Sequence, residues 1–302
     1  MSAPTVERAG VEAAGARATV GDWVTLCKPR LNAMAVATTL GGAWIGSRGD
    51  APAALLVHAV GGTALAACGA SALNMVMERR SDALMRRTRE RPVPAGRLGA
   101  TEAAVFGALL GAGGIAWLAA ATTLLAAALA ALTLLSYLAV YTPLKGRSAT
   151  NTLVGAVPGA LPPLIGWAAV GRELDAGAWV LFTALYLWQI PHFLSIAWLH
   201  REDYARAGLV MLPGVDGDGE AAGRHAVRYA LMLVLLPFLA PATGLAGGAL
   251  FAVGAALLGA GYAAAAWGFL RVRSDARART LLRASLLYVP ALFALLVLDP
   301  VR

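Results

Sequence analysis

The chain has 302 residues, of which 59% are hydrophobic and 14% are charged, and its mean hydropathy is +0.66. This composition excludes an ordinary soluble globular protein and is typical of an integral membrane protein. The formal net charge of +8 would suit a nucleic-acid partner, but the basic residues lie in short loops between apolar runs. We therefore expect no nucleic acid and interpret the charge as loop residues that face the cytoplasm.

The first 22 residues lack an unbroken apolar run, so we expect no cleaved signal peptide. We predict a cytoplasmic tail at 1–22 and a single polytopic membrane domain at 23–302. A membrane span needs about 20 mostly apolar residues. Nine such stretches follow, at 31–47, 53–74, 101–120, 123–142, 150–170, 177–198, 226–243, 247–270 and 279–298. The expected fold is an all-α bundle of nine transmembrane helices without a soluble second domain.

The orientation follows from the lysines and arginines. With the N-terminus inside, only Arg48, Arg172 and Arg302 lie on the outer side, and the other 22 of the 25 basic residues lie on the cytoplasmic side. This asymmetry predicts a cytoplasmic N-terminus and a C-terminus on the opposite side. The two long polar loops, 75–100 and 199–225, then share the cytoplasmic side. They could form one site at the mouth of the bundle.

The first of these loops follows Asn74, and it holds Glu78 and Asp82 at steps of four residues. On a helix each step advances about 400°, so the three side chains share one face. Two carboxylates and an amide oxygen can hold a hard divalent cation such as Mg²⁺. Arg87 and Arg91 follow within a run of arginines, which predicts a metal–phosphate site. The alternative is a charged loop that only marks the cytoplasmic side.

The connection at 141–151, which reads YTPLKGRSATN, adds further positive charge. Lys145 could reach a phosphate group from there, although a positively charged cytoplasmic loop explains it as well. Pro158, Pro162 and Pro163 lie inside the span that follows. They predict a kinked helix beside a cavity.

The second polar loop contains a second acidic group, Glu202 and Asp203, with Arg201 and Arg206 beside it. Two acidic loops on one side could clamp a diphosphate through two metal ions. Such a clamp would neutralise a leaving diphosphate, as the ionisation of an allylic diphosphate requires. A solvated loop is the alternative interpretation.

His192 lies near the end of the sixth apolar span, between Pro191 and Phe193, and Trp188 lies four residues before it. A histidine within a span is a candidate for function, as an iron ligand, a general base or a hydrogen-bond donor. A hydrogen-bonded core histidine is the alternative. The two aromatic side chains offer flat apolar surface to a ligand.

Six pieces of the chain occur in the order known from one family: KPRL at 28–31, N-x-x-x-E-x-x-x-D-x-x-M-x-R-T-x-x-R-P at 74–92, YTPLK at 141–145, PPLIGW at 162–167, WQ-x-PHF at 188–193 and REDY-x-x-A-G-x-x-M-L-P at 201–213. With them the chain resembles the UbiA superfamily of intramembrane prenyltransferases. Within it, the PPLIGW, PHF and REDY pieces favour the protohaem IX farnesyltransferases (haem O synthases). Glu78 stands where many members have Asp, Cys27 stands where Thr is common, and Glu202 and Asp203 are adjacent where the quinone branch has spaced aspartates.

The resemblance implies a UbiA-type bundle in the inner cell membrane, with a cytoplasm-facing active site. It implies that the enzyme joins farnesyl diphosphate to haem B with Mg²⁺ as cofactor, and that a downstream haem A synthase is a partner. The implied metal ligands are Asn74, Glu78, Asp82 and Asp203, and His192 joins them as a catalytic residue. The implied substrate-binding residues are Arg87, Arg91, Lys145, Trp188, Arg201 and Tyr204.

Two other functions remain open at this point. An aromatic prenyltransferase of the same superfamily would act on a quinone precursor and share the diphosphate site. A transporter is a different class, which usually places its charges near the midplane and shows two similar halves. Here the acidic residues cluster at one face, and the sequence shows no internal repeat.

Overall fold

A computed structural model describes residues 18–245 and 248–299, and every regular element within them is helical. Most of the predicted tail at 1–22 lies outside the described residues, and its last three residues begin helix α1. In chain order the helices are α1 (Val20–Leu26), α2 (Pro29–Gly46), α3 (Ala53–Met77), α4 (Arg79–Leu84), α5 (Ala100–Ala121), α6 (Leu124–Leu135), η1 (Ser136–Tyr141), α7 (Thr142–Leu144), α8 (Asn151–Ala160), α9 (Pro162–Ala169), α10 (Ala176–Leu199), α11 (Arg201–Arg206), α12 (Leu212–Val215), α13 (Glu220–Leu235), η2 (Leu236–Leu239), α14 (Ala249–Arg271) and α15 (Asp275–Leu298).

Eight helical stretches in the described part of the chain are long and apolar enough to cross a bilayer. They are Ala53–Met77, Ala100–Ala121, Leu124–Leu144, Asn151–Ala169, Ala176–Leu199, Glu220–Leu239, Ala249–Arg271 and Asp275–Leu298. The remaining predicted span corresponds to α2, whose 18 residues reach about 27 Å along a helix. Because α2 begins with Pro-Arg-Leu-Asn and contains two threonines, it is too polar to be among these eight stretches. A multi-pass helical membrane protein is thus confirmed, and the count of nine spans stays a prediction.

Two predicted spans differ in detail from the helices. The stretch predicted at 226–243 begins six residues earlier, at Glu220, and its helix ends at Leu239. Gly219, with φ +76°, precedes its first residue, so the turn into the helix is set by glycine and not by the start of the apolar run. The prolines of the fifth span break it as predicted, because α8 ends at Ala160 and α9 starts with Pro162.

Small residues allow the helices to approach closely, as is common in membranes. Helices α3 and α5 cross where Gly69 faces the backbone of Gly111, and where Gly114 faces the backbone of Ala66. A Cβ atom at either glycine would overlap the opposite backbone. This close packing fixes the end of α3, and with it the first polar loop.

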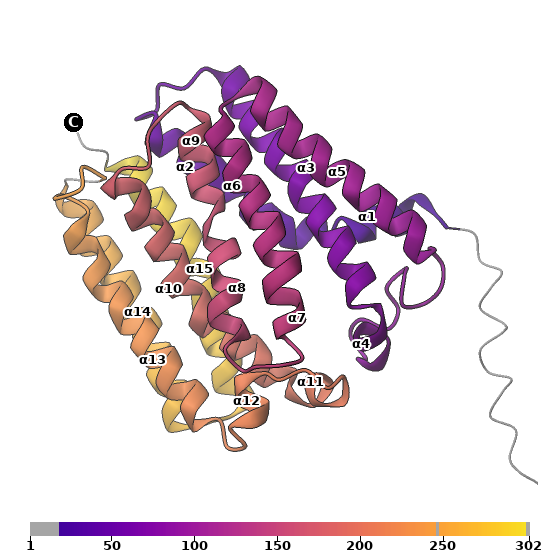
Figure 1. Ribbon diagram of the computed structural model, residues 1–302. Coiled ribbons are helices and arrows are strands. Elements are labelled where there is room, and N and C mark those ends of the chain that lie inside the picture. The colour runs from indigo at the N-terminus through magenta and orange to yellow at the C-terminus, as the bar shows by residue number, and fades with distance from the viewer. Residues whose placement is uncertain (1–17, 246–247, 300–302) are drawn as a thin grey trace, which may run out of the picture.

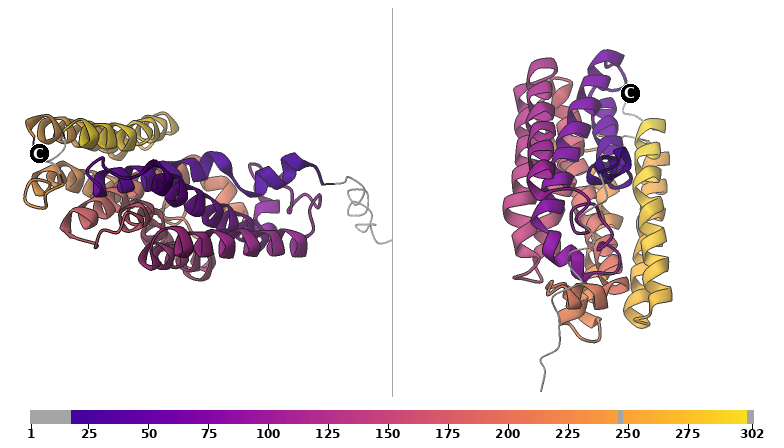
Figure 2. Two further views of the ribbon diagram at one scale, coloured as in Figure 1. Left: turned by 90° about the horizontal axis from the view of Figure 1, so that it is seen from above. Right: turned by 90° about the vertical axis from the view of Figure 1, so that its right-hand side faces the viewer.

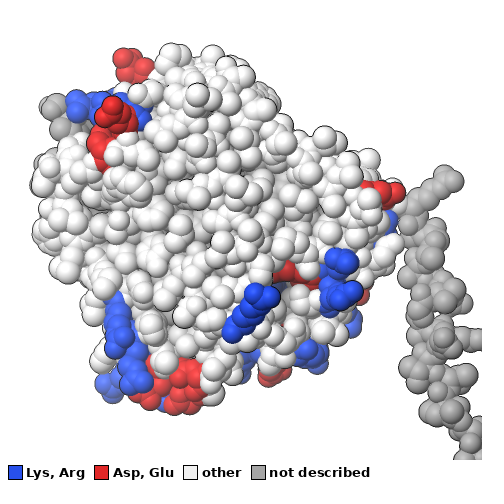
Figure 3. All heavy atoms as spheres, in the orientation of Figure 1, with Lys and Arg blue, Asp and Glu red and all other residues white. Residues whose placement is uncertain are grey.

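The short helices between the spans gather at one end of the bundle, where α4, α11 and α12 lie together (Figure 1). Most of the charged side chains gather at this end, below a broad band of uncharged surface (Figure 3). Helix α15 runs along the outside of the bundle, and it ends at Leu298 at the opposite end of the bundle (Figure 2). The bundle therefore has one polar end, and the candidate site lies there.

Candidate functional site

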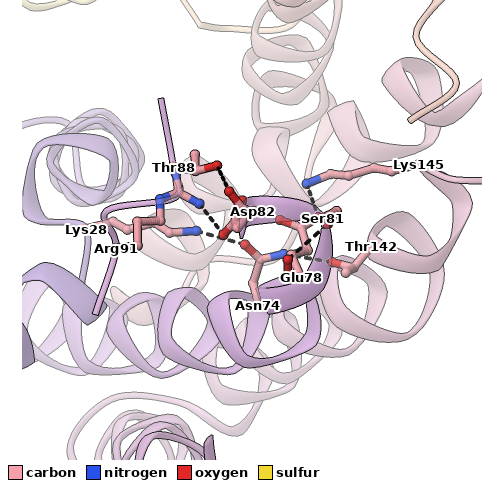
Figure 4. A network of polar contacts seen from close by, with 9 residues as sticks. All are labelled: Lys28, Asn74, Glu78, Ser81, Asp82, Thr88, Arg91, Thr142 and Lys145. Atoms are coloured by element: carbon pink, nitrogen blue, oxygen red, sulfur yellow. Dashed lines mark hydrogen bonds and ion pairs between the residues drawn. The ribbon is translucent and has the colours of Figure 1, made fainter. Parts of the chain in front are cut away.

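The first acidic motif lies at the junction of α3 and α4. The structure corrects one detail of the prediction, since the helix is interrupted at Glu78, which has φ −89° and ψ 4°. The helical hydrogen bonds of the two important steps persist, from Glu78 N to Asn74 O (2.9 Å) and from Asp82 N to Glu78 O (2.7 Å). The three side chains therefore still point to one side, as Figure 4 shows.

Each of these three side chains contacts a cationic group from a different segment (Figure 4). Lys28 Nζ donates to Asn74 Oδ1 at 2.8 Å. Lys145 Nζ lies 2.7 Å from a Glu78 carboxylate oxygen, with both side chains largely buried at 13% and 12% exposure. Arg91 Nη1 lies 2.7 Å from Asp82 Oδ2. We call the residues Lys28, Asn74, Glu78, Asp82, Arg91 and Lys145 the polar cluster.

The polar cluster contains three cations and two carboxylates, so it carries a surplus of positive charge. Burial and the nearby charge of Arg91 together lower the pKa of Lys28 to about 7, although the Glu78 carboxylate acts against this shift. Lys28 also has a left-handed backbone conformation, with φ 45°. The neighbouring cations of Arg91 and Lys145 contribute to the lowered pKa of Lys28, so an anion placed among these groups would be bound favourably.

The second acidic loop approaches the first loop from α11. Burial raises the pKa of Asp203, but the Arg206 guanidinium and the backbone N–H groups of Arg86 and Arg87 outweigh it and hold the pKa below its usual value. The ion pair between Arg206 and Asp203 measures 2.7 Å. Asp203 is therefore an ionised side chain beside the 86–87 backbone.

Tyr204 extends from the same helix toward the polar cluster. Burial raises the pKa of Tyr204, and the Glu78 carboxylate acts in the same direction. The cations of Arg87 and Lys145 act against this shift. The loop after α11 is held to the 141–151 connection at two points. Val210 N donates to Lys145 O at 2.7 Å, and Asn151 Nδ2 donates to Val210 O at 2.7 Å. The second polar loop thus lies against the 141–151 connection.

Three of the predicted site residues lie apart from the polar cluster. Arg201 contacts Asp275 Oδ1 at 3.0 Å and stacks over the Trp198 ring at 4.6 Å. Trp188 Nε1 donates to Ser285 O at 2.7 Å, and the His192 ring stacks on Trp188 with centroids 5.0 Å apart. All three contact α15 or its neighbours, so a direct role beside the carboxylates is not supported for them.

The oxygen donors of the cluster suit Mg²⁺, because a carboxylate pair with an amide oxygen is a typical donor set for that ion. Within residues 18–245 and 248–299, however, no three His, Cys, Asp or Glu side chains lie close enough to hold one ion together. Asp203 therefore does not complete a protein-only cage with Glu78 and Asp82. Mg²⁺ generally binds through one or two carboxylates plus substrate phosphates, and this arrangement fits that mode.

Two polar residues of the site were not singled out from the sequence. Thr142 accepts a hydrogen bond from Asn74 Nδ2 at 3.2 Å, and Asn151 fixes the loop after α11. Both are buried, at 8% and 1% exposure. A threonine and an asparagine at the ends of apolar runs were the available signal, and ordinary helix capping explained them as well.

Comparison with known proteins agrees with this geometry. Residues 35–288 match the model of the UbiA prenyltransferase family. A protohaem IX farnesyltransferase of Solibacter usitatus is 41% identical over 287 residues, which cover 92% of this chain and 98% of that relative. The protein of the same name from Myxococcus xanthus is 42% identical over 286 residues, or 93% of this chain and 95% of the relative.

Solved structures share the fold at lower identity. A digeranylgeranylglyceryl phosphate synthase structure matches with a TM-score of 0.77 at 15% identity, covering 93% of this chain and 98% of that one. A UbiA homologue from Archaeoglobus fulgidus, bound to GPP and Mg²⁺, matches with a TM-score of 0.62 at 18% identity, covering 91% and 99%. The chain therefore belongs to the UbiA prenyltransferase family.

Proposed function

We propose that this protein transfers the farnesyl group of farnesyl diphosphate to a vinyl group of haem B and so forms haem O. The observation that carries the proposal is the polar cluster, an electropositive group with two carboxylates at the polar end of an apolar bundle. The relatives named protohaem IX farnesyltransferase support the choice of substrates, because they align over almost their full length.

The diphosphate would lie among Lys28, Arg91 and Lys145, whose three cations come from three separate segments. Arg87 and Tyr204 border the same space, since the Arg87 charge acts on the phenol of Tyr204. Diphosphate oxygens would replace the carboxylates as partners of Lys145 and Arg91. The released carboxylates would then be free to hold a metal ion.

Asn74, Glu78 and Asp82 are the residues that would hold Mg²⁺, with Asp203 across from them on the second loop. When bound, the ion would neutralise the charge of the leaving diphosphate. The GPP and Mg²⁺ bound to the Archaeoglobus fulgidus homologue support this assignment.

The chemistry begins when the C–O bond between farnesyl and diphosphate breaks and the diphosphate leaves with the electron pair. The resulting allylic cation needs surroundings with little water, and the apolar bundle supplies them. The electrons of the haem vinyl group then form a carbon–carbon bond with the cation. Water adds to the carbocation left on the porphyrin side and loses a proton, which gives the hydroxyethylfarnesyl group.

The hydrogen bonds of His192 suit a haem ligand. Ser285 Oγ donates its proton to Leu282 O at 2.6 Å, so it can only accept from His192 Nδ1, 2.7 Å away. His192 therefore carries its proton on Nδ1, and Nε2 keeps a lone pair. Histidine ligands of metals usually have this arrangement, with the second nitrogen donating to a neighbour. We infer that Nε2 of His192 faces the iron of haem B.

We infer a location in the inner cell membrane. The basic-residue asymmetry supports an orientation with the N-terminus and both polar loops in the cytoplasm and the C-terminus outside. A haem A synthase would use the product as its substrate. This assignment makes that enzyme the expected downstream partner.

One experiment tests the proposed function directly. The purified protein is incubated with haem B, farnesyl diphosphate and Mg²⁺, and the product is identified by mass. We expect haem O and free diphosphate. Prenylation of 4-hydroxybenzoate without any reaction on haem would replace the haem assignment with the aromatic prenyltransferase alternative.

A further inference from the structure

We propose that Thr142 is a positioning residue that orients the side-chain amide of Asn74, so that the amide oxygen faces the cation site. The inference rests on the metal site of the proposed function. It concerns a residue that makes no contact with the carboxylates and that the comparisons do not assign.

The backbone around Thr142 has an unusual form. The π-helical segment η1 (Ser136–Tyr141) is followed by Thr142, whose backbone N–H donates to the carbonyl of Tyr137. Thr142 Oγ1 donates to the same carbonyl at 2.8 Å. Short π-helical insertions occur frequently at functional sites, because they change which residues face a given side. Here the insertion places Thr142 and Lys145 on the side that faces the first acidic motif, as Figure 4 shows.

The donor and acceptor roles of the Thr142 hydroxyl group follow from its contact with the Tyr137 carbonyl. Its single proton is used in the bond to the Tyr137 carbonyl, so toward Asn74 it offers only lone pairs. The contact with Asn74, at 3.2 Å, must therefore involve the Nδ2 donor of the amide and not its oxygen. The oxygen consequently lies on the other side of the amide group.

A second neighbour requires the same orientation. The Lys28 ammonium group is a donor without an acceptor, and it lies 2.8 Å from Asn74 Oδ1. Thr142 thus binds the nitrogen of the Asn74 amide and Lys28 binds its oxygen, and both contacts favour the same orientation. In this arrangement the oxygen of Asn74 is presented to a cation, as a metal ligand must be.

Burial makes the contact important. Asn74 is 1% exposed and Thr142 is 8% exposed, so water cannot easily replace the hydroxyl as the acceptor for Nδ2. Without that acceptor the amide would gain by rotating toward other partners. A rotated amide would direct its N–H groups at the metal and weaken binding.

The test uses Thr142→Val, which keeps the shape and removes the acceptor, and Thr142→Ser, which keeps the acceptor. Mn²⁺ replaces Mg²⁺, and its binding to the full-length protein is followed by electron paramagnetic resonance with farnesyl thiodiphosphate as an unreactive substrate analogue. We expect Thr142→Val to weaken Mn²⁺ binding by about 10- to 100-fold, as for other residues that orient metal ligands. Thr142→Ser should bind Mn²⁺ like the unchanged protein. Thr133→Val is the matched control, since Thr133 Oγ1 only bonds its own helix at Leu129 O.

The same substitution in an Asn74→Asp background separates positioning from general packing. A carboxylate has no N–H end to orient, so Thr142→Val should not weaken Mn²⁺ binding there. An equal loss in both backgrounds, or unchanged Mn²⁺ binding by Thr142→Val in the Asn74 protein, would overturn the inference. If Asn74→Asp fails to bind Mn²⁺ at all, the comparison of Thr142→Val with Thr142→Ser still decides.

The two proposals fail in distinguishable ways. If all variants bind Mn²⁺ as predicted but no haem O forms, haem B is not the acceptor. The proposed role of Thr142 would then still stand. If haem O forms but Thr142→Val and Thr142→Ser bind Mn²⁺ equally well, the proposed function stands and the positioning role of Thr142 is wrong. In the active enzyme Thr142→Val should lower kcat at saturating metal less than it raises the metal concentration needed for half activity.

Discussion

Lys145 and Glu78 lie 2.7 Å apart, although 67 residues separate them in the chain. The pair joins the end of α3 to the end of α7, and the Lys145 ammonium also lies 4.5 Å from the centre of the Tyr141 ring. The ring and the carboxylate hold the ammonium at the mouth of the bundle before any substrate arrives. A bound diphosphate would take over this ammonium and free Glu78 for the metal.

Lys145→Met should therefore remove most of the affinity for farnesyl diphosphate. The substitution also leaves the largely buried Glu78 carboxylate without its cation. In comparable buried pairs such a change lowers the free energy of unfolding by about 3–5 kcal/mol. Loss of one fixed donor to the leaving group should lower kcat/KM by about 100-fold or more. Arg147→Met, an exposed residue of the same connection, is the control, and binding of the substrate analogue by calorimetry is the measurement. Near-normal affinity in Lys145→Met would place the diphosphate elsewhere.

Asp82→Asn should abolish turnover while the protein still inserts and folds. Asp82 is 1% exposed and pairs with Arg91, and the amide keeps the shape but loses the charge that would hold the metal. We expect product formation to fall by about 100- to 1,000-fold. Excess Mg²⁺ should restore little of it. Glu90→Gln, at a side chain that is 78% exposed, should leave activity unchanged. A fully active Asp82→Asn variant would exclude Asp82 from the metal site.

Much of the fold follows from local patterns that a single sequence displays. Runs of about 20 apolar residues predict spans because the bilayer sets their length. Steps of four residues place Asn74, Glu78 and Asp82 on one side even though the helix is interrupted at Glu78. The break between α8 and α9 follows in the same way from its prolines.

Contacts between distant segments were beyond such patterns. No local signal pairs Lys28 with Asn74, or sets Thr142 against the amide of Asn74, because these contacts depend on how whole helices pack. The same holds for Arg201, which the sequence placed beside the acidic loop and which the structure pairs with Asp275 on α15. A charge run gives the side of the membrane, whereas the partner of each charge is decided by tertiary packing.

The topology is a third testable consequence. A reporter fused after Arg302 should behave as an extracytoplasmic protein, because helix α15 ends at the opposite end of the bundle from α11 and because 22 of the 25 basic residues lie on the other side. A reporter placed between Gly217 and Asp218, in the second polar loop, should behave as cytoplasmic. A cytoplasmic signal from both positions would mean that one of the last three spans, Glu220–Leu239, Ala249–Arg271 or Asp275–Leu298, does not cross the membrane.

The last prediction concerns the acceptor. If Nε2 of His192 faces haem iron, the detergent-solubilised protein should bind haem B with a Soret band, and His192→Ala should shift that band or weaken haem binding. Ser285→Ala should act in the same direction by about 10-fold, because the loss of the acceptor at Nδ1 no longer fixes the proton there. Both variants should lower haem O formation more than they lower binding of farnesyl diphosphate, since the polar cluster is left intact. His225→Ala, on α13, is the control, because that ring only stacks on Tyr229 among the described contacts. Unchanged haem spectra and product yield in His192→Ala would reduce this histidine to a packing role against Trp188, and the acceptor would have to be bound by other residues.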